Sequence, residues 1–136
     1  MEKEIVHKIL NNFKDKRALV IGDSILDETH FLDVIGLSLE TPTLKTREVK
    51  IERELGGAFN VAKNIVNLGA KCYFLTMLAK DSYVDYFNIE HPNFELLPVY
   101  GKSKNTIKKR YWINRGGHSY KHLQINISDD GEIPIE

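Results

Sequence analysis

The sequence of 136 residues has a single cysteine, Cys72, and therefore no partner for an internal disulfide. A lone cysteine inside an apolar run is typical of a buried structural thiol, which suits a reducing cytoplasm. No apolar stretch approaches the roughly 20 residues that span a bilayer, and the N-terminus does not have the shape of a signal peptide. We therefore expect a cytoplasmic protein with no membrane partner.

The chain also lacks an excess of either charge, because nineteen basic residues balance nineteen acidic ones. Nucleic-acid-binding proteins usually carry a basic surface, so we expect no nucleic-acid partner. The longest basic cluster, 108–110, is short enough to be a solvated face. The five histidines show no metal-ligand spacing, and we expect no metal site. The length favours one domain with a core of its own.

Buried-type strands and amphipathic helices dominate the first half of the chain. Residues 3–14 and 58–68 place apolar side chains at helical spacing, and 18–21 and 72–78 are short apolar runs, as in strands of a parallel sheet. The order strand, helix, strand predicts a right-handed βαβ unit. The predicted core contains Cys72 and six further apolar residues: Val20, Ile21, Val61, Ile65, Leu75 and Met77.

A second kind of strand mixes charged and apolar residues, which indicates a sheet with one polar face. Residues 43–52, 106–113 and 120–127 have this pattern, and Asn-Arg-Gly-Gly over 114–117 is a turn signal between the last two. We expect a smaller, half-exposed sheet with an antiparallel hairpin. The segment 88–104, with two prolines, is expected to be the least structured part.

Three groups of residues could carry chemistry. Asp27 ends a Gly-Asp-Ser-Ile-Leu-Asp run directly after the first strand, where ligands bind in open α/β sheets; such polar residues can also simply cap a turn. Gly56 and Gly57 precede the second helix, so a ligand can approach its first-turn N–H groups. Asn60 in that turn offers both a donor and an acceptor, although an ordinary tight turn would look similar.

The third group lies on one face of the strand 106–113. Thr106, Lys108 and Arg110 are spaced two residues apart, so in an extended strand their side chains point to the same side. Two cations and a hydroxyl could hold a phosphate group. An exposed edge strand would carry similar charges, because edges are often protected with lysine.

Together these patterns match one family in order and spacing. The chain has Gly-Asp-x-x-x-Asp over 22–27, Ser-x-Glu-Thr-Pro over 38–42, and Gly-Gly-Ala-x-Asn-Val-Ala-x-Asn-Ile over 56–65, followed by Leu-Gly-Ala over 68–70. From about residue 17 to 126 it resembles the PfkB or ribokinase-like carbohydrate kinases. The short spacing between the glycines and the asparagine is similar to the heptose 7-phosphate kinase branch.

The resemblance implies an α/β, Rossmann-like ribokinase fold with a small antiparallel β-sheet lid over the sugar. The core would cover about 1–30 and 52–105, and the lid strands about 31–51 and 106–127. The substrate would be a sugar phosphate, phosphorylated with ATP and Mg²⁺ in the parent kinase. Family members of this type often form homodimers by clasping their lids, and the same is expected here.

The resemblance also implies roles for individual residues. Asp27 matches the family aspartate that binds sugar hydroxyls, and Asn60 matches its sugar-contacting asparagine. Gly56 and Gly57 match the hinge glycines. Three residues lie where the family's lid strand passes over the substrate: Thr106, Lys108 and Arg110.

The chain departs from the family in several places. The family's catalytic aspartate lies in a later Gly-Ala-Gly-Asp motif, which this sequence does not contain. The segment after Asp81 is short, so one core helix is truncated or absent. Leu39 replaces a usual proline, and Gln124 and Asn126 stand where the heptose branch usually has Arg and Asp. We expect the isolated chain not to phosphorylate a sugar.

Several interpretations of this departure stay open. The chain could be a fragment of a kinase that lacks its C-terminal half, one chain of a split kinase, or a non-catalytic sugar-phosphate-binding or regulatory protein. A remote alternative is a GDSL-type hydrolase, because Gly-Asp-Ser follows a strand and Ser24 would be its nucleophile. That chemistry needs a histidine base held near the serine.

Overall fold

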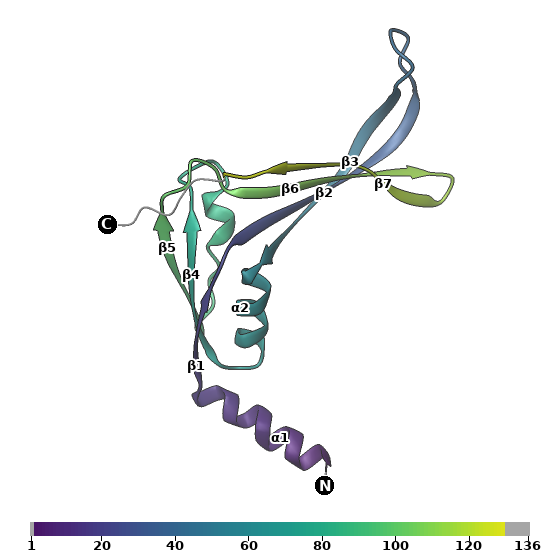
Figure 1. Cartoon of the computed structure of the whole chain (residues 1–136). Helices are drawn as coiled ribbons and strands as arrows, with labels where there is room; N and C mark the ends of the chain where they lie inside the picture. Colours follow the sequence, from purple (N-terminus) through teal and green to yellow (C-terminus); the bar gives the residue numbers. More distant parts are fainter. Residues whose placement is uncertain (1, 130–136) are drawn as a thin grey trace.

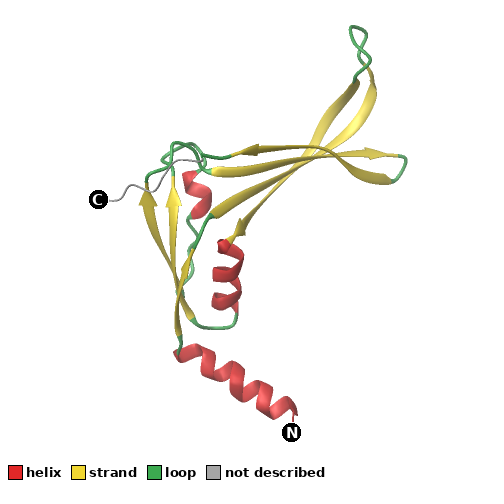
Figure 2. Ribbon diagram, in the orientation of Figure 1, coloured by secondary structure: helices red, strands yellow, loops and turns green. Residues whose placement is uncertain are grey.

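The computed structural model describes residues 2–129. Within them, seven strands form two sheets (Figure 2). Two α-helices and two short 3₁₀ helices complete the fold. In chain order the elements are α1 (Glu2–Asn12), η1 (Phe13–Asp15), β1 (Arg17–Ile21), β2 (Ser24–Leu37), β3 (Leu44–Gly57), α2 (Ala58–Asn67), β4 (Lys71–Leu78), η2 (Val84–Phe87), β5 (Phe94–Tyr100), β6 (Thr106–Arg115) and β7 (His118–Ile127).

The first sheet, called here the core sheet, is parallel and has the order β1-β4-β5. Helix α2 lies along one of its faces (Figure 1). Phe59, Ala62 and Val66 of α2 are buried there against Phe74 and Phe94 of the sheet. The predicted βαβ unit of β1, α2 and β4 is therefore confirmed.

The opposite face of the core sheet is open, so the prediction that both Val20 and Ile21 of β1 belong to the core is only partly correct. Val20 and Cys72 point toward α2 and are buried as predicted, but Ile21 is 68% exposed. On α2 itself Val61 is 52% exposed, because the helix turns Phe59 and Ala62 inward instead. Three more residues of the predicted core are only half-buried: Ile65, Leu75 and Met77.

The segment 88–104 was expected to be the least structured part of the chain, but much of it forms a strand. Residues 94–100 form β5, which pairs with β4 throughout its length. Pro98 had argued against a strand, because proline cannot donate to a sheet ladder. It is tolerated because β5 is an edge strand of the core sheet.

The second sheet, called here the lid sheet, has the order β3-β2-β6-β7 and projects away from the core (Figure 1). It was expected to be antiparallel, but β2 and β6 pair in parallel. Strand β2 follows β1 in the chain, and β6 follows β5. Because β1 and β5 both run parallel to β4, β2 and β6 begin at the same end of the core sheet. The predicted β6–β7 hairpin is present, and β2 and β3 extend the expected 31–51 segment to Ser24 and Gly57.

A small apolar cluster joins the two sheets. Leu26 of β2 and Ile107 of β6 are buried against Leu78 of β4 and Phe87 of η2. This contact fixes the base of the lid sheet on the core, so residues next to Leu26 and Ile107 lie at the junction of the two sheets.

The predicted N-terminal helix is present as α1, which extends away from the core sheet at the end opposite the lid (Figure 1). Its apolar stripe of Ile5, Val6 and Ile9 is exposed. No helix in the described part of the chain is long and apolar enough to cross a membrane.

Candidate functional site

Asp27 and Arg110 form an ion pair at the junction of core and lid. Asp27 is on β2 and Arg110 is on β6, and Nη1 of the arginine lies 2.5 Å from Oδ1 of the aspartate. Both side chains are about three-quarters buried. The pairing brings together two residues that lie 83 positions apart in the sequence and that were singled out separately.

Gly56 makes room for this carboxylate. A Cβ atom on Gly56 would lie 2.8 Å from Oδ2 of Asp27, closer than a Cβ carbon comes to a neighbouring atom in real structures. The aspartate is thus fitted between the Gly56 backbone on one side and Arg110 on the other. Such an arrangement holds a carboxylate in one orientation, with lone pairs left to accept further hydrogen bonds.

Gly57 has a different task, because it turns the chain from β3 into α2. Its φ is +64°, in the left-handed region that favours glycine. A Cβ there would lie 2.5 Å from the backbone oxygen of Asp23. The same oxygen accepts a hydrogen bond from the N–H of Ala58 at 3.0 Å, so this turn ties the start of α2 to the end of β1.

Lys108 and Thr106 lie on the same face as Arg110, as expected from strand alternation. Lys108 pairs in register with Asp27 on one side and Asn126 on the other. Its ammonium group makes no hydrogen bond or ion pair with another described residue. The amide of Asn126 accepts a hydrogen bond from Nε2 of Gln124 at 2.9 Å, so the neighbouring strand offers neutral amides rather than charges.

Asn60, unlike Asp27 and Arg110, is exposed to solvent. It lies in the first turn of α2, and its side chain makes no hydrogen bond with the other six predicted residues among the described residues. A further ion pair lies between Asp23 and Lys102 at 2.8 Å, beyond the end of β1. The structure thus gathers Asp27, Gly56 and Arg110 tightly and leaves Asn60 at the rim.

Ser24 has the wrong surroundings for a hydrolytic nucleophile. It is only 2% exposed, and its hydroxyl hydrogen bonds to the Thr76 hydroxyl at 3.2 Å. Its side chain has no histidine partner among the described residues. Among the described residues, no histidine is therefore placed to act as the base that a serine hydrolase needs to activate Ser24.

Two hollows within residues 2–129 are lined by none of the seven predicted site residues. One, of about 540 Å³, lies between β3, α2 and the segment after η2. Another, of about 360 Å³, follows the open face of the core sheet up to Asp23. The described residues also contain no group of three or more acidic, histidine or cysteine side chains able to hold a metal ion.

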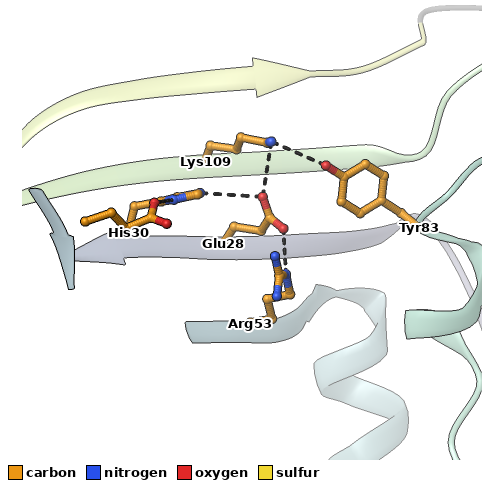
Figure 3. Close-up of polar contacts among 6 residues, drawn as sticks. Glu28, His30, Arg53, Tyr83 and Lys109 are labelled. Atoms are coloured by element: carbon orange, nitrogen blue, oxygen red, sulfur yellow. Dashed lines mark hydrogen bonds and ion pairs between the residues drawn. The ribbon is translucent and has the colours of Figure 1, made fainter. Parts of the chain in front are cut away.

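A buried ionic cluster around Glu28, which the sequence analysis did not predict, lies on the opposite face of the lid sheet (Figure 3). Glu28 of β2 is 1% exposed and receives Nε of Arg53 at 2.7 Å, while Nζ of Lys109 lies 3.3 Å from its other oxygen. Burial alone would raise the pKa of Glu28, but Arg53 and Lys109 outweigh burial and leave this pKa below its ordinary value. The one available signal was a charged residue at an inward position of the alternating 24–30 segment.

The sequence of the chain is similar to that of bifunctional HldE proteins. Bifunctional protein HldE of Campylobacter jejuni subsp. doylei is 30% identical over 120 residues, which are 88% of this chain and 25% of that protein. HldE of Koribacter versatilis is 37% identical over 78 residues, which are 57% of this chain and 16% of that protein. The chain therefore spans about a quarter or less of these curated relatives. No protein-family model matches it.

The solved structures that the chain resembles are also kinases. A carbohydrate kinase from Agrobacterium tumefaciens has a TM-score of 0.59 at 15% identity, over 82% of this chain and 35% of that one. Phosphofructokinase-2 from Escherichia coli, in complex with fructose-6-phosphate, has a TM-score of 0.55 at 19% identity, over 79% of this chain and 34% of that one. At such low identity the likeness shows the fold alone, and the predicted ribokinase-like fold is confirmed.

Proposed function

The chain is a relative of the HldE proteins with the fold of the PfkB or ribokinase-like carbohydrate kinases, and from this premise we propose that it is the sugar-binding part of such a kinase. The substrate proposed is a sugar phosphate such as heptose 7-phosphate. The observation that carries the proposal is the Asp27 carboxylate, held between Gly56 and Arg110 at the junction of core and lid.

The proposed sugar contacts follow from the chemistry of the held carboxylate. An ionised Asp27 only accepts hydrogen bonds, so it selects hydroxyl donors rather than anions. Charge-assisted hydrogen bonds of this kind are short and about twice as strong as neutral ones. Asn60, exposed in the first turn of α2, can donate and accept toward further hydroxyls.

The proposed phosphate contacts come from β6. Arg110 uses one N–H on Asp27 and has four of its five donors left. Lys108 has no acidic partner among the described side chains, so its charge is available to an anion. The neutral amides of Gln124 and Asn126 beside these cations add donors without repelling a phosphate.

The residues of this chain do not fit the nucleotide part of the reaction. The sequence contains no Gly-Ala-Gly-Asp motif, and phosphoryl transfer relies on positioned phosphate and metal contacts. We therefore derive no transfer step from these residues, and ATP and Mg²⁺ belong to the proposed parent kinase.

Calorimetry on residues 1–136 tests the sugar-binding proposal with three ligands: heptose 7-phosphate, the unphosphorylated heptose and inorganic phosphate. We expect the sugar phosphate to bind best, and Asp27→Ala to cost about 1–3 kcal/mol of sugar binding because a charged hydrogen-bond partner is lost. Asp33→Ala is the matched control, since Asp33 lies on the same strand and is exposed. No binding of any sugar, or equal losses in both variants, would remove the proposal.

The catalytic part is tested separately by incubating residues 1–136 with ATP, Mg²⁺ and heptose 7-phosphate. We expect no phosphorylated product, because too few of the elements of phosphoryl transfer are present. Robust ATP-dependent turnover by the purified chain would contradict this expectation and would show that the nucleotide binds without the family's motif.

A further inference from the structure

The Glu28 cluster joins three strands of the lid sheet around one buried carboxylate. Arg53 comes from β3 and Lys109 from β6, and both reach Glu28 on the central strand β2 (Figure 3). His30 of β2 stacks on Tyr111 and lies with Nε2 3.6 Å from Glu28. A buried carboxylate is costly unless it is well paired, so the two cations are held in place by Glu28.

Each of the two cations also contacts a tyrosine of the core. Nζ of Lys109 lies 3.3 Å from the hydroxyl of Tyr83, and the Arg53 guanidinium lies 5.3 Å from the centre of the Tyr86 ring. Both tyrosines belong to the short segment around η2, between the core strands β4 and β5. That segment is anchored in the core by Phe87, which is completely buried.

The cluster lies directly behind the candidate sugar site. Asp27 precedes Glu28 on β2, and Arg110 follows Lys109 on β6, so the two ion pairs connect the same strands from opposite faces of the lid sheet. A change in the tilt of these strands relative to η2 would therefore move Asp27 and Arg110 relative to Gly22 and Asp23 of the core.

We propose that Glu28 is a positioning residue of the sugar site, which holds Lys109 and Arg53 on Tyr83 and Tyr86 and thereby latches the lid to the core. The effect of this latch on sugar binding rests on the proposed function, whereas the latch between lid and core does not depend on it. Opening the lid breaks the two tyrosine contacts while the ion pairs of Glu28 stay within the lid sheet.

Variants of the tyrosines separate a latch from a cluster that merely stabilises the lid sheet. Tyr83→Phe removes the hydroxyl that Lys109 contacts, and Tyr86→Leu removes the aromatic ring under Arg53 together with that ring's contact with Tyr83. Neither substitution changes a residue that forms an ion pair with Glu28. Tyr100→Leu is the matched control, because Lys80 lies 4.8 Å from the Tyr100 ring in an equivalent cation–π contact made within the core.

The latch itself is measured without ligand. Spin labels on Asn67→Cys in α2 and Ser119→Cys in β7, both exposed positions, report the distance between core and lid, while the buried native Cys72 stays unlabelled. We expect a narrow distance distribution in the parent chain and in Tyr100→Leu, and a broader one in the Tyr83→Phe/Tyr86→Leu double variant. An unchanged distribution in the double variant overturns the latch.

The positioning effect is measured by heptose 7-phosphate binding to the same chains. We expect the double variant to bind about three- to tenfold more weakly, the range of one or two lost hydrogen-bond-sized contacts, with Tyr100→Leu unchanged. A broadened distribution with unchanged affinity overturns the positioning role. If the parent chain binds no sugar phosphate, the proposed function fails and the positioning role fails with it, whereas the distance measurement still decides the latch.

Discussion

Two adjacent glycines, Gly56 and Gly57, do different things, and the difference is visible only in their surroundings. At Gly56 an added Cβ meets the end of the Asp27 side chain, which can rotate away. At Gly57 it meets a backbone oxygen, and the residue also has a positive φ. Gly56 is therefore needed because it leaves space for the Asp27 carboxylate, and Gly57 because it allows the backbone to turn.

This contrast gives a prediction for Gly56→Ala. We expect the free energy of unfolding to change by less than about 1 kcal/mol, since alanine is no worse than glycine in a strand interior. Sugar affinity should fall, because Asp27 is displaced from its position beside Arg110. Chemical denaturation and calorimetry on the same preparation give both values.

Gly57→Ala is the control for that experiment. We expect it to destabilise the fold by about 1–3 kcal/mol, the usual cost of a residue held in a disfavoured backbone region. If Gly56→Ala instead unfolds the chain, or leaves sugar affinity intact, then Gly56 does not act through Asp27.

Some residues of the candidate site could be singled out from the sequence, but their contacts could not. Asp27, Gly56 and Arg110 stood out because motif spacing and strand alternation are local properties. The contact between Asp27 and Arg110 depends on the parallel pairing of β2 with β6, which no local pattern specifies. Glu28 was missed for a related reason, since a charged residue at an inward position is explained only by partners on β3 and β6.

At the scale of elements, β2 and β6 are held together by ion pairs on both faces of the lid sheet. The pair of Glu28 and Lys109, which is the more buried one, should make the stability of the fold depend on pH. The lowered pKa of Glu28 means that its ionised form favours the folded state. This contribution is fully present above the ordinary value of 4.5 and is lost as the pH falls through the lowered folded-state pKa.

We therefore expect Glu28→Gln to be less stable than the parent chain at neutral pH, and the difference to shrink as the pH falls below about 4.5. Denaturation curves from pH 7 to pH 2 measure it. Asp81, whose pKa burial would raise but hydrogen bonds from Asn105 lower, adds acid sensitivity that cancels in the difference. A difference that is constant with pH would contradict the role of the charge.

Glu95→Gln is the matched control for this measurement. Glu95 pairs with Lys71 at 3.3 Å on the surface of the core sheet, and its side chain is 48% exposed. Exposed pairs contribute little to stability, so this variant should follow the parent chain at every pH tested.

The elements themselves were predicted better than their burial. Helix α2 has apolar residues on most of its circumference, so periodicity could not decide which ones face the sheet, and Phe59 rather than Val61 points inward. Strand β5 was missed because Pro98 reads as a break, although an edge strand tolerates it. Both errors arise because the position of a neighbour, not the local sequence, determines the outcome.

At the scale of the whole molecule, apolar side chains remain exposed on both sheets of the described residues, in addition to the stripe on α1. On the open face of the core sheet, Leu19 and Ile21 are 57% and 68% exposed. Parallel sheets are usually covered on both faces. On the lid sheet, Leu123 and Ile125 are 49% and 42% exposed.

The lid surface leads to the last prediction, that two copies of the chain associate through their lids. Leu123 and Ile125 lie on β7, which with β3 forms the unpaired edges of the lid sheet, and such edges invite pairing with another chain. We expect light scattering to show a concentration-dependent dimer that Leu123→Lys/Ile125→Lys disrupts, because each copy would bring two charges into the contact. Leu19→Lys/Ile21→Lys is the control, since it places the same charges on the core sheet instead. A parent chain that stays monomeric at every concentration refutes lid association, and a dimer lost only in the control places the contact on the core sheet.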